Sequence, residues 1–341
     1  MKGKGNKVRY NLHLTRYQHL VTNKKLSKAI KQEFGGTSPE DIYRGAAITA
    51  SMMQDSLAHR CGAEELYWLH NGKKTVFVTD NLIQMLARAK FTMSENATIE
   101  PIEGFETFTI AVPKNTFVTD DDGNKIEIRP FLMSCLTVHE SIEKIQGNYK
   151  RVTGCDSVQS VDLLQDVGET VITVTYESNE ISYQTTEKVS NILNVLKNGL
   201  RDNKALHQHQ MLDPEERRQS QMMIRLATAF LIYTNAKSGE NIKDGYPSDC
   251  VFDIEKGFTR AFWNATSSDV PTRKARSQTK VNDEANSKGH KQSWNVRSAH
   301  LKNLSHERFY QGEHAWRPRG SRWILVDEYE AGEKIDAHHS E

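Results

Sequence analysis

The residues best suited to chemistry gather in one short segment near the end of the chain. The segment HERFYQGEHAWRPRGSRWI (306–324) holds two histidines, four arginines, two tryptophans and a Phe-Tyr pair. Paired histidines can act as general base and general acid in RNA cleavage, while arginine or lysine stabilises the charge on the phosphorane. His300 lies six residues before the start of this segment. We keep His300, together with His306 of the segment, as the only candidates for catalysis.

The same segment also has the composition of a nucleic-acid surface. Arginine forks bind phosphates, and aromatic rings stack on unpaired bases. The candidates for such contacts are Lys302, Arg308, Phe309, Tyr310, Trp316, Arg317, Arg319 and Arg322. A third interpretation is structural, since Trp316 and Trp323 could form the core of a small module that has little else to bury. All three interpretations stay open at this point.

Other familiar sites are not indicated. The chain lacks a Walker loop and the G-x-G-x-x-G, H-E-x-x-H and G-x-S-x-G motifs. The four cysteines are too far apart for structural zinc. His207 and His209 have no obvious set of further ligands, and Asp120–Asn124 is predicted to be a turn rather than a calcium loop. We therefore expect no metal and no cofactor.

The formal charge of +1 conceals a strong asymmetry along the chain. Residues 1–32 contain nine Lys/Arg and no Asp/Glu, and residues 264–326 contain 12 basic and 5 acidic residues. Residues 33–263 are acidic, with 23 basic and 33 acidic side chains, and residues 327–341 hold 1 basic and 6 acidic. Two basic ends on an acidic body are expected where a protein contacts a polyanion, although solvated arms would have the same composition.

The elements that must position these residues are helices and strands in mixed order. Asp213-Pro214-Glu215-Glu216 begins a helix over 213–236 that is apolar on nearly all sides and should cross the core. Further helices are predicted over 38–60, 81–91 (capped by Asp80 or Asn81) and 186–200. Strands are predicted over 74–80, 106–113 (half-buried) and 169–177, and an Asp-Gly hairpin turn is predicted at 120–124. The fold class is therefore α+β, with a mixed helix and antiparallel-sheet core.

Five segments follow from these patterns. Residues 1–36 form a basic N-terminal arm, a flexible Gly/Lys start followed by a helical hairpin from Leu12. Residues 37–263 form the α+β core, and 264–293 form a polar, basic linker. Residues 294–330 form a small aromatic and basic module, and 331–341 form an acidic tail.

The order of these segments resembles a family of phage and mobile-element proteins that includes an anti-CRISPR acting against a type V CRISPR nuclease. The resemblance is strongest in a C-terminal box, here His300, LKNLSHERFYQG (301–312) and RWILV (322–326). It extends to LATAFLIYTNAKSGENIKDGYP (226–247) and to VFVTDNLIQML (76–86), and spans roughly residues 60–326.

The resemblance implies a counter-defence protein that suppresses production of a bacterial nuclease. Such a protein recognises the nascent peptide of its target on the ribosome and promotes loss of the encoding mRNA. The expected partners are therefore a bacterial defence protein or its nascent peptide, with mRNA or the ribosome. A metal-independent ribonuclease and a stoichiometric protein-binding inhibitor remain the alternatives. No stretch approaches the roughly 20 apolar residues of a membrane span, so we expect the cytoplasm of the bacterial host and no membrane partner.

Overall fold

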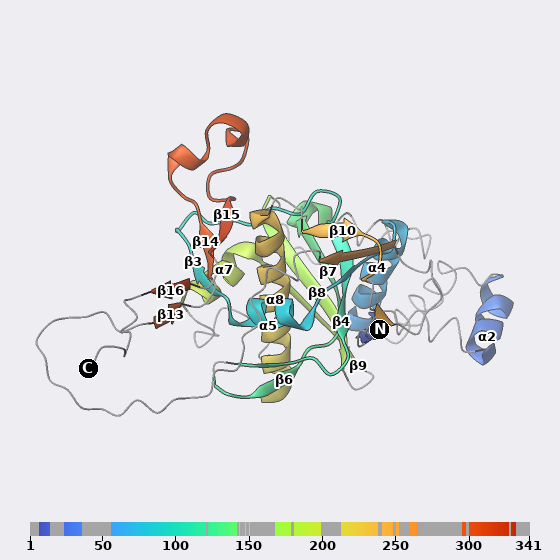
Figure 1. Ribbon diagram of the computed structural model, residues 1–341. Helices are drawn as coiled ribbons and strands as arrows, with labels where there is room; N and C mark the ends of the chain where they lie inside the picture. Colours follow the sequence, from blue (N-terminus) through green and yellow to red (C-terminus); the bar gives the residue numbers. More distant parts are fainter. Residues whose placement is uncertain are drawn as a thin grey trace, which may run out of the picture.

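Figure 1 shows the computed structural model of the chain. The structure describes residues 7–13, 24–35, 56–120, 122–141, 143, 147, 150, 168–178, 181–198, 213–237, 241–247, 250–251, 260–264, 295–297, 300–326 and 329–331. Its helices and strands, in chain order, are β1 (Val8–Asn11), α2 (Lys24–Phe34), α4 (Ser56–His70), β2 (Lys74–Phe77), α5 (Asp80–Arg88), β3 (Lys90–Thr92), β4 (Thr107–Pro113), β5 (Phe117–Thr119), β6 (Lys125–Glu127), β7 (Phe131–Thr137), β8 (Thr170–Ser178), β9 (Ile181–Lys188), α7 (Val189–Asn198), α8 (Pro214–Ala236), β10 (Ile242–Asp244), β11 (Cys250–Val251), β12 (Arg260–Asn264), β13 (Asn295–Arg297), β14 (His300–Asn303), β15 (Trp323–Val326) and β16 (Tyr329–Ala331).

The long helix α8 begins at a capping box. The Asp213 carboxylate accepts hydrogen bonds from the backbone nitrogens of Glu215 and Glu216 at 2.8 and 2.9 Å, which satisfies two of the donors that a helix start leaves free. Every residue from Ser220 to Thr234 is buried except Arg225. A helix covered on all sides belongs in the interior. The predicted core helix over 213–236 is confirmed.

A nine-stranded sheet packs against α8. Its main strand order is β10-β12-β2-β4-β7-β8-β9, and β1 pairs with β4 and β11. The neighbours β12, β2 and β4 run parallel, whereas β4, β7, β8 and β9 alternate in direction. Helices and a mixed sheet together confirm the predicted α+β class.

The two faces of this sheet carry different helices. Met133 and Cys135 of β7 join the apolar cluster around α8, whereas the Ser134 hydroxyl donates to the Glu64 carboxylate of α4 at 3.2 Å. Because successive residues of a strand point to opposite faces, α4 and α8 cover opposite sides of the sheet. This explains why all seven residues of β4 are buried, so the prediction of a half-buried strand there was wrong.

Helix boundaries differ from the sequence-based expectations in several places. The helix predicted over 81–91 ends at Arg88, before the strand β3, and the helix predicted over 186–200 begins only at Val189, because residues 186–188 belong to the strand β9. The cap of α5 is Thr79, whose hydroxyl accepts from the backbone nitrogen of Leu82 at 3.3 Å, not Asp80 or Asn81. The helix predicted to end near Arg60 continues to His70, and residues 36–55 lie outside the described residues. The continuation is stabilised by Trp68, which is buried and donates from Nε1 to the Lys74 carbonyl at 2.7 Å.

The N-terminal arm contains one predicted and one unpredicted element. The helix α2 agrees with the second helix of the predicted hairpin, and its Lys25, Lys28 and Lys31 are exposed. Residues 14–23, where the first helix of the hairpin was predicted, lie outside the described residues. Residues 8–11, expected to be part of a flexible start, form the strand β1. Burial of Tyr10, whose ring lies 5.2 Å from that of Phe77, explains why this stretch joins the sheet.

The C-terminal segment is joined to the main body by a second sheet. The strand β14 pairs antiparallel with β15 and parallel with β3. Leu301 and Trp323 belong to the same apolar cluster as α8. The predicted linker (264–293, except Asn264) and acidic tail (331–341, except Ala331) lie outside the described residues, and the segment boundaries stay predictions. Within the described ranges no helix is both long and apolar enough to cross a bilayer.

Candidate nucleic-acid interface

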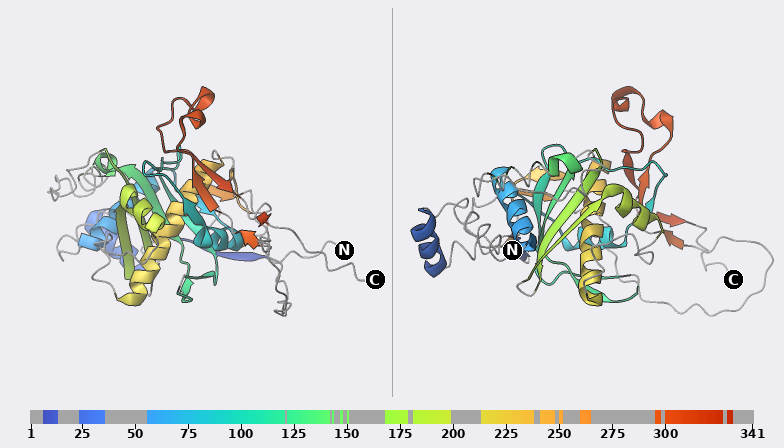
Figure 2. Two further views of the ribbon diagram at one scale, coloured as in Figure 1. Left: turned by 90° about the vertical axis from the view of Figure 1, so that its left-hand side faces the viewer. Right: turned by 180° about the vertical axis from the view of Figure 1, so that it is seen from behind.

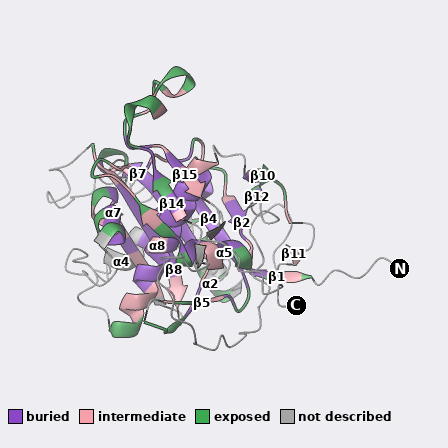
Figure 3. Ribbon diagram, turned by 60° about the vertical axis from the view of Figure 1, so that its left-hand side comes forward, coloured by how far each residue is buried: buried purple, intermediate pink, exposed green. Residues whose placement is uncertain are grey.

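The segment that contains most of the candidate residues forms a projecting connection between β14 and β15. We call residues 304–322 the finger. It contains two short 3-10 helices, Glu307–Phe309 and Gly312–His314. Figure 1 and both views of Figure 2 show it standing away from the body, and Figure 3 shows its outer part mostly exposed.

The base of the finger is held by contacts with the loop before β4. The amide nitrogen of Asn303 donates to the Gly320 carbonyl at 2.6 Å and to the Arg322 carbonyl at 3.1 Å, while its oxygen accepts from Ser94 at 2.9 Å. Trp323 Nε1 donates to the Thr98 carbonyl at 2.9 Å. The finger is therefore tied to a loop more than 200 residues earlier in the chain.

Tyr310 braces the finger from inside. Its hydroxyl donates to the Leu304 carbonyl at 2.6 Å and accepts from the backbone nitrogens of Gly320 and Arg322 at 2.7 and 3.2 Å. The hydroxyl thus joins the two limbs of the finger at its base. Tyr310, predicted to contact nucleic acid, has a structural role in this position.

Two of the predicted arginines also hold the backbone of the finger. Arg319 donates from Nε to the Ser305 carbonyl at 3.0 Å and pairs with Glu307 at 3.3 Å. Arg322 donates to the Phe309 carbonyl. These guanidinium groups still add positive charge, but replacing them would disturb the finger as well as its surface.

The remaining predicted residues are more available for contacts. Lys302 and Arg308 are exposed, and among the described residues no hydrogen bond or ion pair engages either side chain; Arg308 packs on the Phe309 ring at 4.7 Å. Trp316 is 72% exposed, and Arg317 lies 5.1 Å from its ring centre. An exposed indole beside cations can bind both bases and phosphates.

The two candidate catalytic histidines do not share a site. His300 begins β14 at the base of the finger. Since a strand rises about 3.3 Å per residue, the strand alone separates His300 from Asn303 by about 10 Å, and His306 follows three residues later. The Nδ1 atom of His306 accepts from the backbone nitrogen of Arg308 at 3.2 Å, where it caps the first 3-10 helix. The structure therefore does not bring the two imidazoles together as an acid–base pair.

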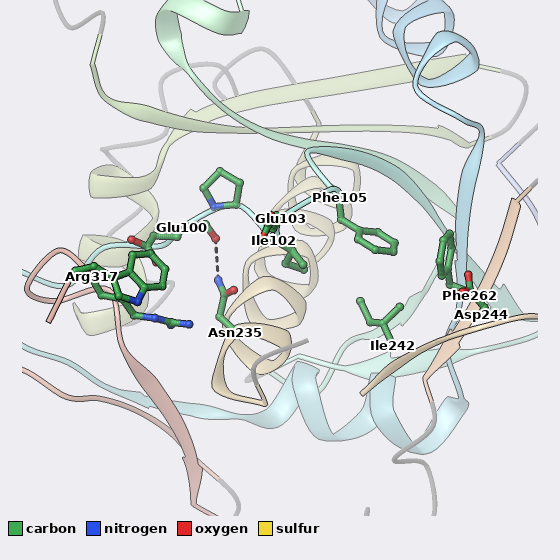
Figure 4. A pocket seen from close by; sticks show the side chains of 11 residues that line it. Glu100, Ile102, Glu103, Phe105, Asn235, Ile242, Asp244, Phe262 and Arg317 are labelled. Atoms are coloured by element: carbon green, nitrogen blue, oxygen red, sulfur yellow. Dashed lines mark hydrogen bonds between the residues drawn. The ribbon is translucent and has the colours of Figure 1, made fainter. Parts of the chain in front are cut away.

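A pocket of about 380 Å³ lies between the finger and the body. Figure 4 shows Arg317 and Glu100 at one end and Phe105, Phe262 and Asp244 at the other. The full lining comprises Glu100, Pro101, Ile102, Glu103, Phe105, Asn235, Ile242, Asp244, Phe262, Trp316 and Arg317. Of these, only Trp316 and Arg317 were singled out from the sequence, because the other residues come from four distant segments with no motif.

A lysine or arginine side chain of the protein packs on each aromatic ring of the pocket. Lys74 Nζ lies 5.3 Å from the Phe105 ring, the Arg260 guanidinium lies 5.2 Å from the Phe262 ring, and Arg317 packs on Trp316. The Nε atom of Arg317 is buried and has no hydrogen-bond partner among the described residues. The pocket thus combines aromatic rings, guanidinium groups and carboxylates.

The described groups whose pKa is clearly shifted lie outside the finger and the pocket. Burial raises the pKa of Glu187, on β9, to about 7, although a hydrogen bond from Asn191 acts in the opposite direction. Burial likewise raises the pKa of the Cys135 thiol to about 12, which keeps it protonated. Within the described part of the chain no group of three or more His, Cys, Asp or Glu could hold a metal ion; His207 and His209 lie outside it.

Comparison with protein-family models, with curated proteins and with solved structures finds no match to this chain.

Proposed function

We propose that this chain is a binding protein that contacts single-stranded RNA through its finger. The observation that carries the proposal is the exposure of Trp316, 72%, on a braced, cationic projection. Among the described residues Trp316 is the large apolar side chain that is exposed, and stacking on an unpaired base would cover it.

Rigidity of the finger supports the same function. The hydrogen bonds of Tyr310 and Asn303 fix the backbone before any ligand arrives. A preformed surface loses less conformational entropy on binding than a flexible one. Lys302 and Arg308 then offer exposed positive charge to phosphates.

The wider role proposed is counter-defence of the anti-CRISPR type. In that role the partner would be a bacterial defence nuclease or its nascent peptide, recognised by the α+β core in the cytoplasm of the host. RNA contact through the finger would hold the protein near mRNA or the ribosome. The basic helix α2, with its exposed Lys25, Lys28 and Lys31, would add a second site of attraction to the polyanion.

A metal-independent ribonuclease is less well supported. General acid–base catalysis needs both groups within reach of the reacting atoms. His300 lies at the base of β14 and His306 beyond its other end.

The experiment is a pull-down of the tagged full chain from bacterial cells, with and without RNase treatment of the lysate. We expect ribosomal proteins or mRNA to be recovered, and to disappear after RNase. A partner protein retained equally in both samples, without RNA, would instead favour the stoichiometric protein-binding inhibitor.

A further inference from the structure

We infer that the pocket between the finger and the body binds one guanine base of the RNA that the finger contacts. This inference rests on the proposed function and names the ligand of one part of the interface. The pocket lies beside Trp316 and Arg317 of the finger. Its volume of about 380 Å³ is at the small end of the range of about 300–1,000 Å³ for ligand sites, as suits a single planar ring system.

Two carboxylates of the pocket can accept hydrogen bonds from a ligand. Glu100 and Glu103 both line the pocket, and no hydrogen bond or ion pair within the described residues uses either carboxylate. The backbone of Glu100 is fixed, since its carbonyl accepts from Asn235 Nδ2 at 2.7 Å. Asp244, at the other end, lies 3.7 Å from Arg260 and is already paired. The carboxylates of the pocket without such a contact therefore lie on the segment 100–103.

The pocket also contains a hydrogen-bond donor, at the same end as Glu100 (Figure 4). Arg317 lines the same pocket, and its Nε is buried without a partner among the described residues. A buried donor without an acceptor is unfavourable. A ligand acceptor placed beside Arg317 would remove that unfavourable term. The ligand must therefore present both donors and acceptors.

The cationic side chains that pack on the aromatic rings disfavour a simple cation as the ligand of the pocket. Phe105, Phe262 and Trp316 each carry a lysine or arginine of the protein itself. A lysine or arginine side chain from a peptide would satisfy the carboxylates, but it would be repelled by Arg317 of the lining and by Lys74 and Arg260, which pack on the phenylalanine rings. A neutral planar ring avoids this repulsion and can still stack.

Guanine is the base whose edges fit this set of groups. It places N1–H and N2–H₂ donors on the edge that would face a carboxylate, and O6 and N7 acceptors on the edge that arginine recognises. Adenine would put its N1 acceptor against the carboxylate. Uracil offers a single donor between two acceptors. The arrangement of Glu100, Glu103 and Arg317 therefore favours guanine over adenine and uracil.

The test is fluorescence anisotropy with labelled eight-nucleotide RNAs, in which the centre of an oligo(U) strand carries G, hypoxanthine, A or U. We expect the G strand to bind at least about fivefold more tightly than the U strand. The hypoxanthine strand, which lacks the N2 amine, should lie between them. In a Glu100→Gln/Glu103→Gln variant the preference for G should vanish while binding of the U strand persists. Glu95→Gln, at an exposed position in the nearby loop, is the charge-matched control and should retain the preference.

Equal affinity of the intact protein for all four strands would overturn the guanine site and leave the RNA-binding finger standing. Failure of every strand to bind would overturn both proposals. A blocked arginine amide that competes with RNA more effectively than guanosine monophosphate would show a basic side-chain site instead, and would also contradict the inference.

Discussion

The hydroxyl of Tyr310 lies 2.7 Å from the backbone nitrogen of Gly320, ten residues later at the opposite limb of the finger. Gly320 itself accepts from Asn303 and from the backbone nitrogen of Thr98 through its carbonyl. One hydroxyl and one glycine thus join the two limbs to each other and to the body.

Replacing Tyr310 with Phe should loosen the finger and leave the body intact. The change removes one hydrogen-bond donor and leaves two backbone N–H groups without their acceptor, a loss of about 1–3 kcal/mol. Hydrogen–deuterium exchange should therefore accelerate at residues 320–322 but not along α8. The matched control is Tyr183→Phe, which removes a hydroxyl bonded to Glu216 far from the finger. Unchanged exchange in the finger of Tyr310→Phe would contradict the bracing role.

Gly320→Ala should be far more harmful than a glycine substitution without a close contact. Gly320 has a φ of +95°, and a Cβ there would lie 1.8 Å from the Asn96 carbonyl oxygen. Gly123 has a similar φ of +86° with nothing within 4 Å, so Gly123→Ala isolates the backbone strain, about 1–2 kcal/mol. Urea denaturation should show an additional loss of about 1–3 kcal/mol for Gly320→Ala, or a detached finger. Equal stability of the two variants would refute the close packing of finger and loop.

Burial of Glu187 should make stability fall as pH rises. Its folded pKa of about 7 lies above the ordinary value of 4.5, so between these values the folded protein holds more protons than the unfolded chain. Linkage then makes the free energy of unfolding decrease from about pH 4.5 to pH 7 and level off above it. Over that range the contribution is at most about 3 kcal/mol. Urea denaturation at several pH values measures the slope.

A Glu187→Gln variant should lose this part of the pH dependence, because the amide cannot ionise. Glu95→Gln, at an exposed position, should keep it. If Glu187→Gln and the unaltered chain decline in parallel between pH 5 and pH 7, the carboxyl is not buried as described.

RNA incubated with the purified protein should remain intact. The separation of His300 and His306 and the capping role of His306 Nδ1 leave no assembled acid–base pair. Gel analysis of a labelled single-stranded RNA, with and without EDTA, checks this. Cleavage that persists in EDTA and disappears in His306→Ala would restore the ribonuclease hypothesis.

The sequence predicted the core well where local signals and burial agree. The capping residues of α8 and its apolar body indicated a core helix, and the alternating or apolar runs at β2 and β8 indicated strands. The strand β1 escaped prediction because its pairing with β4 and β11 and the packing of Tyr10 on Phe77 all involve distant parts of the chain.

The sequence predicted which residue types occur in the candidate site, but it did not predict the role of each residue. Arg319, Arg322 and Tyr310 have the composition of a nucleic-acid surface, yet their polar atoms are used within the finger. The pocket could not be foreseen, since Glu100, Asn235 and Arg317 meet only through the fold. Local sequence does not encode such long-range partners.

The most direct test of RNA contact by the finger is the salt dependence of RNA binding by the intact chain and by Lys302→Gln/Arg308→Gln, in which Lys302 lies on β14 directly before the finger and Arg308 lies within it. Neither side chain holds a hydrogen bond among the described residues, so the double variant should unfold at the same urea concentration. Binding of a labelled oligo(U) strand should weaken, and the slope of log affinity against log salt should fall by about 0.7 for each phosphate that the variant no longer neutralises. Lys197→Gln/Lys243→Gln, at exposed positions on α7 and β10, should bind as the unaltered chain does. Equal affinities and equal slopes for both double variants would contradict RNA binding by the finger.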